Sequence, residues 1–241
     1  MIVHPIGMMR ANAAAGGDPV IVQIGDELDT AKRALYDATD WTTMFTGTGG
    51  TGAVTADGDQ IKYITDLSGG GHHLVAQDGT YAIARAGYID WNGADFQISN
   101  HLTFDAAEQH NIIIVFDPQA DTAWIAMGSK SSSGLYAGYS KPGDTAVTGG
   151  GMGTNVKYSI NNETDLTSPN NGALAAAIAA KSGYRSMTLK NIKMPSLSPL
   201  MISYQIKSAD YDFTGRVKYI VHAFNPTPTQ LSNIHTIWTT A

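Results

Sequence analysis

Short apolar runs separated by Gly, Asp and Asn dominate the chain from Leu35 onward. This spacing is typical of strands joined by tight turns. The clearest run is Asn111–Phe116, which is β-branched and apolar at consecutive positions, so we expect a central strand buried on both faces. Further strands are predicted at 124–127, 135–139, 156–160, 200–206 and 216–224. The pattern predicts an all-β fold, an antiparallel two-sheet β-sandwich.

The chain ends with a predicted helix. Thr227 precedes a proline at the first helical position, and Gln230 follows three residues later, which together form a capping box. Leu231, Ile234 and Trp238 then recur on one helical face. We expect a short C-terminal helix that packs its apolar side against the sandwich.

The first 34 residues differ from the rest of the chain. Small residues fill 11–17, the apolar run 19–24 predicts a strand, and 26–36 predicts a short helix capped by Asp26. We interpret 1–34 as an N-terminal arm or docking segment and 35–241 as the sandwich. The alternative, that this region is the first strand of the sandwich plus a connection, stays open.

The segment 173–180 is rich in Ala and has no clear period. Helix propensity alone favours a helix, because Ala is the strongest helix former. Tertiary context can override propensity in a β-rich domain, and a strand is the interpretation we favour.

Composition agrees with a β-rich domain and restricts its partners. Of the 241 residues, 43% are hydrophobic, which suffices for a sizeable core, while only 15% are charged and 26 are Gly. The formal net charge is −6 and Lys and Arg do not cluster, so nucleic acid and acidic membrane surfaces are not expected partners.

Cysteine is absent, which excludes a disulfide framework, a thiolate zinc site and a cysteine nucleophile. The N-terminal residues 1–7 lack both a basic region and a continuous apolar region, so a secretory signal is not expected. No run approaches the roughly 18 to 20 apolar residues of a membrane span. We expect a protein made in the cytoplasm that has no membrane partner.

Three segments near the start of the sandwich resemble one family. Tyr36–Phe45 is followed by Gly52–Asp59 and then by Asp66–Leu74. This succession resembles the opening of the laminin-G-like, concanavalin A-like lectin/glucanase domains of phage structural proteins, which read V-x-x-D-G-D and then D-x-S-G-N-G-x-H. Phe213–Val217 resembles the final strand of these domains. Gly70 stands where the family has Asn.

The resemblance covers residues 35–241 and implies a jelly-roll sandwich of the concanavalin A type. It also implies a non-enzymatic phage virion surface protein, either a capsid decoration (cement or head-fibre) protein or a small tail or receptor-binding protein. Its partners would be other virion proteins and further copies of itself in a homo-oligomer. One alternative is a carbohydrate-binding module that attaches to host cell-surface glycan, and a second is a glucanase-like glycoside hydrolase.

Asp57, Asp59 and Asp66 are candidate calcium ligands, because Ca²⁺ prefers carboxylate oxygens and lectin relatives sometimes carry calcium at a loop edge. The alternative is purely structural. Asp57-Gly58 is a strong turn signal between strands, and Asp66 can accept hydrogen bonds from the amides of 68–71. We favour the turns and expect no cofactor, with calcium as the one candidate.

Two other motifs are interpreted as structural. Gly47–Gly52 matches G-x-G-x-x-G, a fingerprint that binds dinucleotides when a strand precedes it and a helix follows. Here an Asp- and Thr-rich segment precedes it and 54–58 follows, so we expect a flexible loop and no nucleotide site. Adjacent His72 and His73 point in opposite directions on an extended chain and make a poor metal pair. The resemblance assigns His73 a packing or hydrogen-bonding role.

Trp91, Trp124, Tyr136 and Tyr139 are candidates for a sugar-binding platform, because sugar C–H faces stack on aromatic rings. The alternative is that these side chains fill the core. We favour the core, since Trp124 and Tyr136 lie inside apolar runs.

Hydrolytic chemistry has little support in the sequence. A glycosidase needs two carboxylates about 5 to 10 Å apart. Glu27, Glu108 and Glu163 belong to no alternating pattern, while Asp210 and Asp212 alternate within a polar predicted hairpin. The chain also lacks a G-x-S-x-G nucleophile motif. We expect no enzymatic activity.

Overall fold

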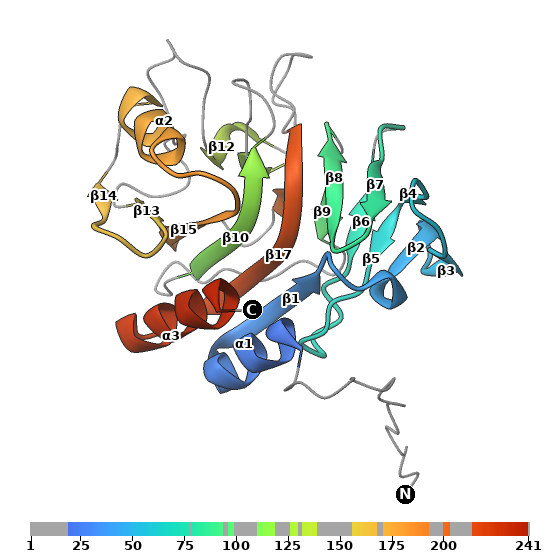
Figure 1. The fold of residues 1–241 in the computed structure, drawn as a ribbon, viewed down its shortest axis with the longest axis horizontal. Helices are drawn as coiled ribbons and strands as arrows, with labels where there is room; N and C mark the ends of the chain where they lie inside the picture. The colour runs from blue at the N-terminus through green and yellow to red at the C-terminus, as the bar shows by residue number, and fades with distance from the viewer. Residues whose placement is uncertain are drawn as a thin grey trace, which may run out of the picture.

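The computed structural model describes residues 19–77, 79–93, 96–98, 110–118, 126–129, 132–138, 156–167, 171–192, 200–202 and 214–240. These residues form two antiparallel β-sheets, here called sheet A and sheet B, with α-helices at the periphery (Figure 1). The prediction of two antiparallel sheets with a short C-terminal helix is therefore confirmed.

Sheet A has its strands in the order β14 (Leu166–Thr167), β13 (Lys157–Ile160), β15 (Arg185–Ile192), β10 (His110–Pro118), β17 (Thr214–Phe224), β8 (Tyr88–Asn92), β7 (Ala82–Arg85) and β4 (Gln60–Ile61). The long strand β17 pairs with β8 over its first residues and with β1 (Lys32–Asp37) over its last. Sheet B has the order β12 (Ser132–Gly138), β11 (Ala126–Ser129), β16 (Leu200–Ile202), β9 (Phe96–Ile98), β6 (Leu74–Ala76), β5 (Tyr63–Ile64), β2 (Met44–Gly47) and β3 (Thr51–Ala53).

The two sheets share one buried apolar cluster. Its members include side chains of both sheets that are at most 1% exposed, among them Ile61, Ile89, Ile114, Ile64, Leu74 and Phe96. The chain passes from sheet A to sheet B within 60–64, where the Lys62 amide donates to the Phe45 carbonyl (2.8 Å). This crossing joins the sheets along one side.

The predicted central strand at 111–116 is confirmed as part of β10. Alternate residues of β10 are buried on opposite faces of sheet A, in one apolar cluster between the sheets and in another on the outer face. Burial on both faces explains why the sequence is apolar at consecutive positions. Ile112 and Ile114 point between the sheets, whereas Ile113 and Val115 point to the opposite face of sheet A.

The other predicted strands are confirmed where the structure describes them. β13 lies within 156–160 and β17 includes 216–224. β16 occupies the first residues of 200–206, and the remainder of that range lies outside the described residues. Strands β11 and β12 occur near 124–127 and 135–139 with shifted bounds.

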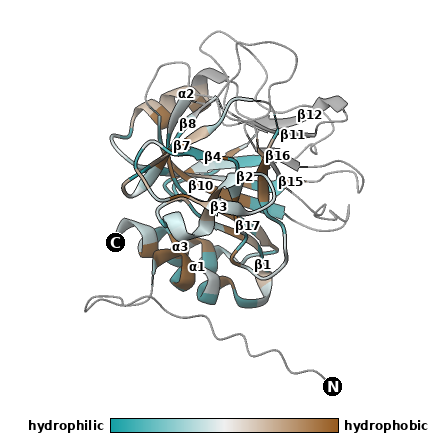
Figure 2. Ribbon diagram, turned by 90° about the vertical axis from the view of Figure 1, so that its right-hand side faces the viewer, coloured by the Kyte–Doolittle hydropathy of each residue, from teal (hydrophilic) through white to brown (hydrophobic). Residues whose placement is uncertain are grey.

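A helix layer covers part of the outer face of sheet A. Helices α1 (Val20–Leu28) and α3 (Pro228–Thr239) lie side by side in Figure 1 and contact each other. Both alternate between hydrophobic and hydrophilic residues in Figure 2, and their apolar residues pack on β1, β10 and β17. The predicted capping box of α3 is confirmed, and Leu231 and Ile234 are buried with Trp238 packed beside them.

Two predictions for the N-terminal region are wrong. The predicted strand at 19–24 is the start of α1, because Ile21, Ile24 and Leu28 recur at helical spacing and pack under α3. Tertiary packing outweighs the β propensity of Val and Ile here. Gly25 lets α1 lie close to the Leu35 side chain of β1, since a Cβ at position 25 would lie 2.8 Å from Leu35 Cδ1.

The predicted helix at 26–36 is also wrong. Asp29 has a positive φ of 44° that ends α1, and the short 3₁₀ helix η1 (Asp29–Ala31) follows. The next residues extend into β1 because β17 offers them a partner strand. The predicted arm therefore continues into this strand, and residue 34 lies inside β1.

The strand interpretation for 173–180 is wrong as well. Most of this segment belongs to α2 (Asn171–Ala179), which buries Leu174 and Ile178, one helical turn apart, in the cluster between the sheets. The high helix propensity of Ala prevails. A second 3₁₀ helix, η2 (Trp41–Thr43), precedes β2, and the Asp40 side chain accepts from the Thr42 amide at its start. None of the described helices is long and apolar enough to cross a membrane.

Candidate functional site

Asp66 is a buried carboxylate, 5% exposed, that organises the loop before β6. Its Oδ1 accepts from the amides of Leu35 (3.0 Å) and Ser68 (2.8 Å). Its Oδ2 accepts from the Ser68 hydroxyl (2.8 Å) and the His72 amide (3.0 Å). The predicted bond to the Ser68 amide is confirmed, the second loop amide is that of His72, and the bond to Leu35 additionally ties the loop to β1.

Asp57 and Asp59 belong to a different turn. The turn at Asp57-Gly58 between β3 and β4 is confirmed, with Gly58 at a φ of 94°. The exposed Asp57 pairs with Arg85 Nη1 (2.8 Å), while Asp59 Oδ2 accepts from the amides of Thr55 (2.9 Å) and Ala56 (3.0 Å). These amide bonds lower the pKa of Asp59.

The three candidate calcium ligands are thus engaged with separate protein groups. Among the described residues, which include Asp57, Asp59 and Asp66, no three His, Asp or Glu side chains come close enough together to hold a metal ion. Calcium binding in these loops stays a prediction.

His73 links the Asp66 loop to sheet B. Its Nδ1 accepts from the Asp66 amide (3.1 Å), and its ring stacks on Tyr63 with centroids 5.0 Å apart. The packing and hydrogen-bonding role expected for His73 is thus seen in the structure. The glycine-rich stretch 47–52 forms the turn between β2 and β3 and has strands on both sides, which is unlike a nucleotide-binding loop.

Of the four residues of the predicted aromatic platform, only Trp91 has a side chain that the structure describes. Trp91 is 1% exposed, and its ring meets that of Phe96 at an angle of 59° with centroids 4.9 Å apart, so it joins the two sheets inside the core. Tyr136 lies in β12. Trp124 and Tyr139 lie outside the described residues, as do Glu108, Asp210 and Asp212.

The two described glutamates hold separate elements in place. Glu27 of α1 accepts two hydrogen bonds from α3. Its backbone carbonyl accepts from Gln230 Nε2 (2.9 Å), and its Oε1 accepts from Asn233 Nδ2 (3.1 Å). Glu163, with its side chain 57% exposed, pairs with Lys181. These two glutamates therefore serve different structural contacts.

The outer face of sheet B presents aromatic side chains that sequence reasoning missed. Phe45 pairs with Tyr63 in the strand register, and Tyr63 pairs with Val75. These three residues are half-buried, whereas their strand neighbours Ile64 and Leu74 are fully buried between the sheets. From Val75, the row of paired residues continues across the neighbouring strands of sheet B through Gln97, Met201 and Gly128 to Tyr136.

Phe45, Tyr63 and His73 form what we call the ring cluster. The Phe45 and Tyr63 rings meet edge to face with centroids 5.7 Å apart, and His73 stacks on Tyr63. Partial burial and the nearby Asp66 charge raise the pKa of Tyr63, so its hydroxyl remains neutral near pH 7. A half-buried cluster with a neutral hydroxyl can stack on an apolar ligand surface and exchange hydrogen bonds with it.

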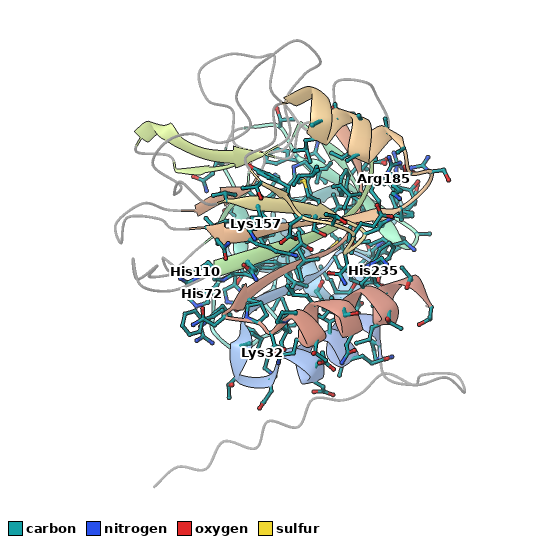
Figure 3. The ribbon with its side chains drawn as sticks, turned by 90° about the vertical axis from the view of Figure 1, so that its left-hand side faces the viewer. Lys32, His72, His110, Lys157, Arg185 and His235 are labelled. Atoms are coloured by element: carbon teal, nitrogen blue, oxygen red, sulfur yellow. The ribbon has the colours of Figure 1, made fainter. Side chains whose placement is uncertain are left out.

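A histidine pair lies between the two central strands of sheet A. His110 Nδ1 and His222 Nε2 are 3.0 Å apart, their rings are nearly parallel, and both residues are 2% exposed. Burial, followed by the positive charges of His110, Arg33 and His72, lowers the pKa of His222 well below its ordinary value. His72 and His110 lie at the same end of sheet A in Figure 3.

No family model, curated protein or solved structure matches the chain. The resemblance to phage lectin-like domains thus rests on the residues quoted for it alone.

Proposed function

We propose that the protein is a non-enzymatic surface protein of a phage virion, built on a jelly-roll sandwich of the concanavalin A type. It serves as a capsid decoration protein or as a small tail or receptor-binding protein. Other virion proteins are its partners, and it assembles as a symmetric homo-oligomer. The Asp57–Asp59 turn and the Asp66–His73 loop support the resemblance, because both motifs form ordered turns between strands.

The observation that carries the proposal is the difference between the two outer sides of the molecule. The segment 1–34, which we interpret as a docking arm, contributes α1 to the helix layer. Sheet B lies on the other side of the shared core and presents the ring cluster. This arrangement suits a protein that attaches by one side and displays the other.

Antibody labelling of purified particles from the source of the chain tests this proposal. Label over the head supports a decoration protein, and label at the tail tip supports a receptor-binding protein. Particles that carry no label and no peptide of the chain by mass spectrometry contradict the virion assignment.

A carbohydrate-binding module is the second candidate, and the ring cluster favours it. Aromatic rings on a sheet surface can stack on the C–H faces of sugars. A glycan array probed with the intact chain should show saturable binding that Tyr63→Ala abolishes. Tyr81→Ala, which alters a half-buried tyrosine beneath Lys62, should retain it. Equal binding by both variants would remove the ring cluster as the sugar site.

A further inference from the structure

Helix α1 has little stability of its own. It has 9 residues, and isolated helices shorter than about 12 residues are marginal in water. Its β-branched Val and Ile residues and Gly25 lower its helix propensity further. Among the described residues no side chain caps its N-terminus, and Asp26 and Glu27 lie in its last turn, where carboxylates oppose the helix dipole. α1 therefore depends on the surface that it packs against.

That surface holds α1 in the way that an apolar groove holds a separate helix. Ile21, Ile24 and Leu28 are at most 2% exposed, and they follow the i, i+3 and i+7 spacing of helices bound in such grooves. They share one buried cluster with apolar side chains of β1, β10, β17 and α3. We call these partners the α1 seat, formed by Leu35, Ile113, Val115, Val221, Leu231 and Ile234.

The link between α1 and β1 is short and strained. It consists of η1, whose first residue, Asp29, has a φ of 44° and a ψ of −113°. Glycine adopts this combination, whereas a residue with a Cβ rarely does, so the backbone is strained where α1 ends. The 3 residues of η1 would span about 10 Å if extended, which is about the diameter of a helix. An opened link would thus relieve Asp29 and let α1 reach a seat other than its own.

The outward side of α1 also carries an apolar residue. Val22 is 37% exposed, and it is the one large hydrophobic side chain that is exposed in the part of the chain that the structure describes. Its neighbours Ile21 and Ile24 are buried in the seat, so Val22 is turned away from it. Apolar residues toward the seat and away from it are expected for a helix that lies between two bodies.

We propose that two copies of this chain exchange α1, so that α1 of each copy packs in the α1 seat of the other. Exchange keeps the contacts of Ile21, Ile24 and Leu28, because the two seats are identical, and it relaxes Asp29 in both copies. Short links under strain favour such exchange. A second copy is the partner that fits, since it supplies the same helix with the same anchor spacing. This inference rests on the homo-oligomer of the proposed function and assigns the segment that joins its copies.

Cross-linking of the full chain tests where α1 packs. The chain has no cysteine, so Glu27→Cys combined with Asn233→Cys introduces one thiol on α1 and one on α3, at side chains that are 3.1 Å apart. After treatment with a short bismaleimide reagent, exchanged copies should give a covalent dimer on a denaturing gel, because the α1 and α3 in contact belong to different chains. The matched control is Glu163→Cys combined with Lys181→Cys, an ion pair within one copy, which should stay at the mass of one chain.

Asp29→Gly tests the strained link. Glycine relieves the strain without exchange, so the unexchanged chain gains stability relative to the exchanged pair. Sedimentation equilibrium should then show self-association weakened about tenfold or more. Asn162→Gly is the matched control, because Asn162 also has a positive φ (55°) but lies in the turn between β13 and β14. This control should self-associate as the wild type does.

Other results would overturn the exchange, and they separate it from the homo-oligomer. A chain that is oligomeric by light scattering but gives only single-chain products from the α1–α3 thiol pair would refute the exchange and leave the homo-oligomer intact. Equal dimer yields from both thiol pairs, or equal self-association of Asp29→Gly and wild type, would also refute it. A chain that is monomeric from about 1 μM to about 1 mM would refute both.

Discussion

Among single residues, Asp66 has the strongest structural role, because four hydrogen bonds from three residues converge on one buried carboxylate. Asp66→Asn should lower the free energy of unfolding by about 2 to 4 kcal/mol, since the amide nitrogen would face groups that donate. Urea unfolding measures this loss. Asp57→Asn, which alters a carboxylate with 58% side-chain exposure, should cost under about 1 kcal/mol. Equal losses would contradict the assigned role.

The His110–His222 pair makes stability depend on pH. The pKa of His222 is lowered in the folded state, so the unfolded chain binds more protons as the pH falls below about 6.5. The free energy of unfolding should therefore decrease from pH 7.5 toward pH 5, with Arg33 and His72 adding to the repulsion.

Urea unfolding at several pH values, compared with His222→Gln, measures this effect. The variant should lose most of the pH dependence in this range. His235→Gln, which removes a less buried histidine of lowered pKa on α3, should retain most of it. A wild-type stability that is flat or rises on acidification would contradict the account.

At the scale of elements, α3 depends on its N-terminal cap. The Thr227 hydroxyl accepts from the Gln230 amide (3.2 Å), and Gln230 Oε1 accepts from the Thr227 amide (2.9 Å). Thr227→Ala should lower the free energy of unfolding by about 1 kcal/mol. Thr229→Ala, an exposed threonine two residues later, should change it by less than about 0.5 kcal/mol. Chemical denaturation of both variants distinguishes these outcomes.

Local signals predicted the elements that depend on neighbouring residues. The capping box of α3, the turn at Asp57-Gly58 and the buried strand β10 could all be predicted because each arises within a few residues. α1 could not, since its Val and Ile residues favour a strand until α3 and sheet A cover them. In α2, helix propensity was the better guide.

The candidate sites depended on contacts far apart in sequence. Asp66 bonds Leu35 across 31 residues, and His110 meets His222 across 112. Such pairings follow from strand order and register, which single-sequence patterns do not encode. The ring cluster required the same information, because Phe45, Tyr63 and His73 come from separate segments of the chain.

For the whole molecule, the central claim is that the helix layer faces the particle while sheet B is displayed. The chain has no cysteine, so single introduced thiols report accessibility without background. Thr51→Cys on β3 and Ser232→Cys on α3 both replace exposed residues. Each variant should react with a maleimide reagent as an isolated protein.

The deciding measurement is maleimide labelling of these two variants on purified particles. The account predicts that Thr51→Cys remains reactive and that Ser232→Cys becomes protected. Equal reactivity at both positions, protection of Thr51→Cys alone, or absence of the chain from the particles would contradict it.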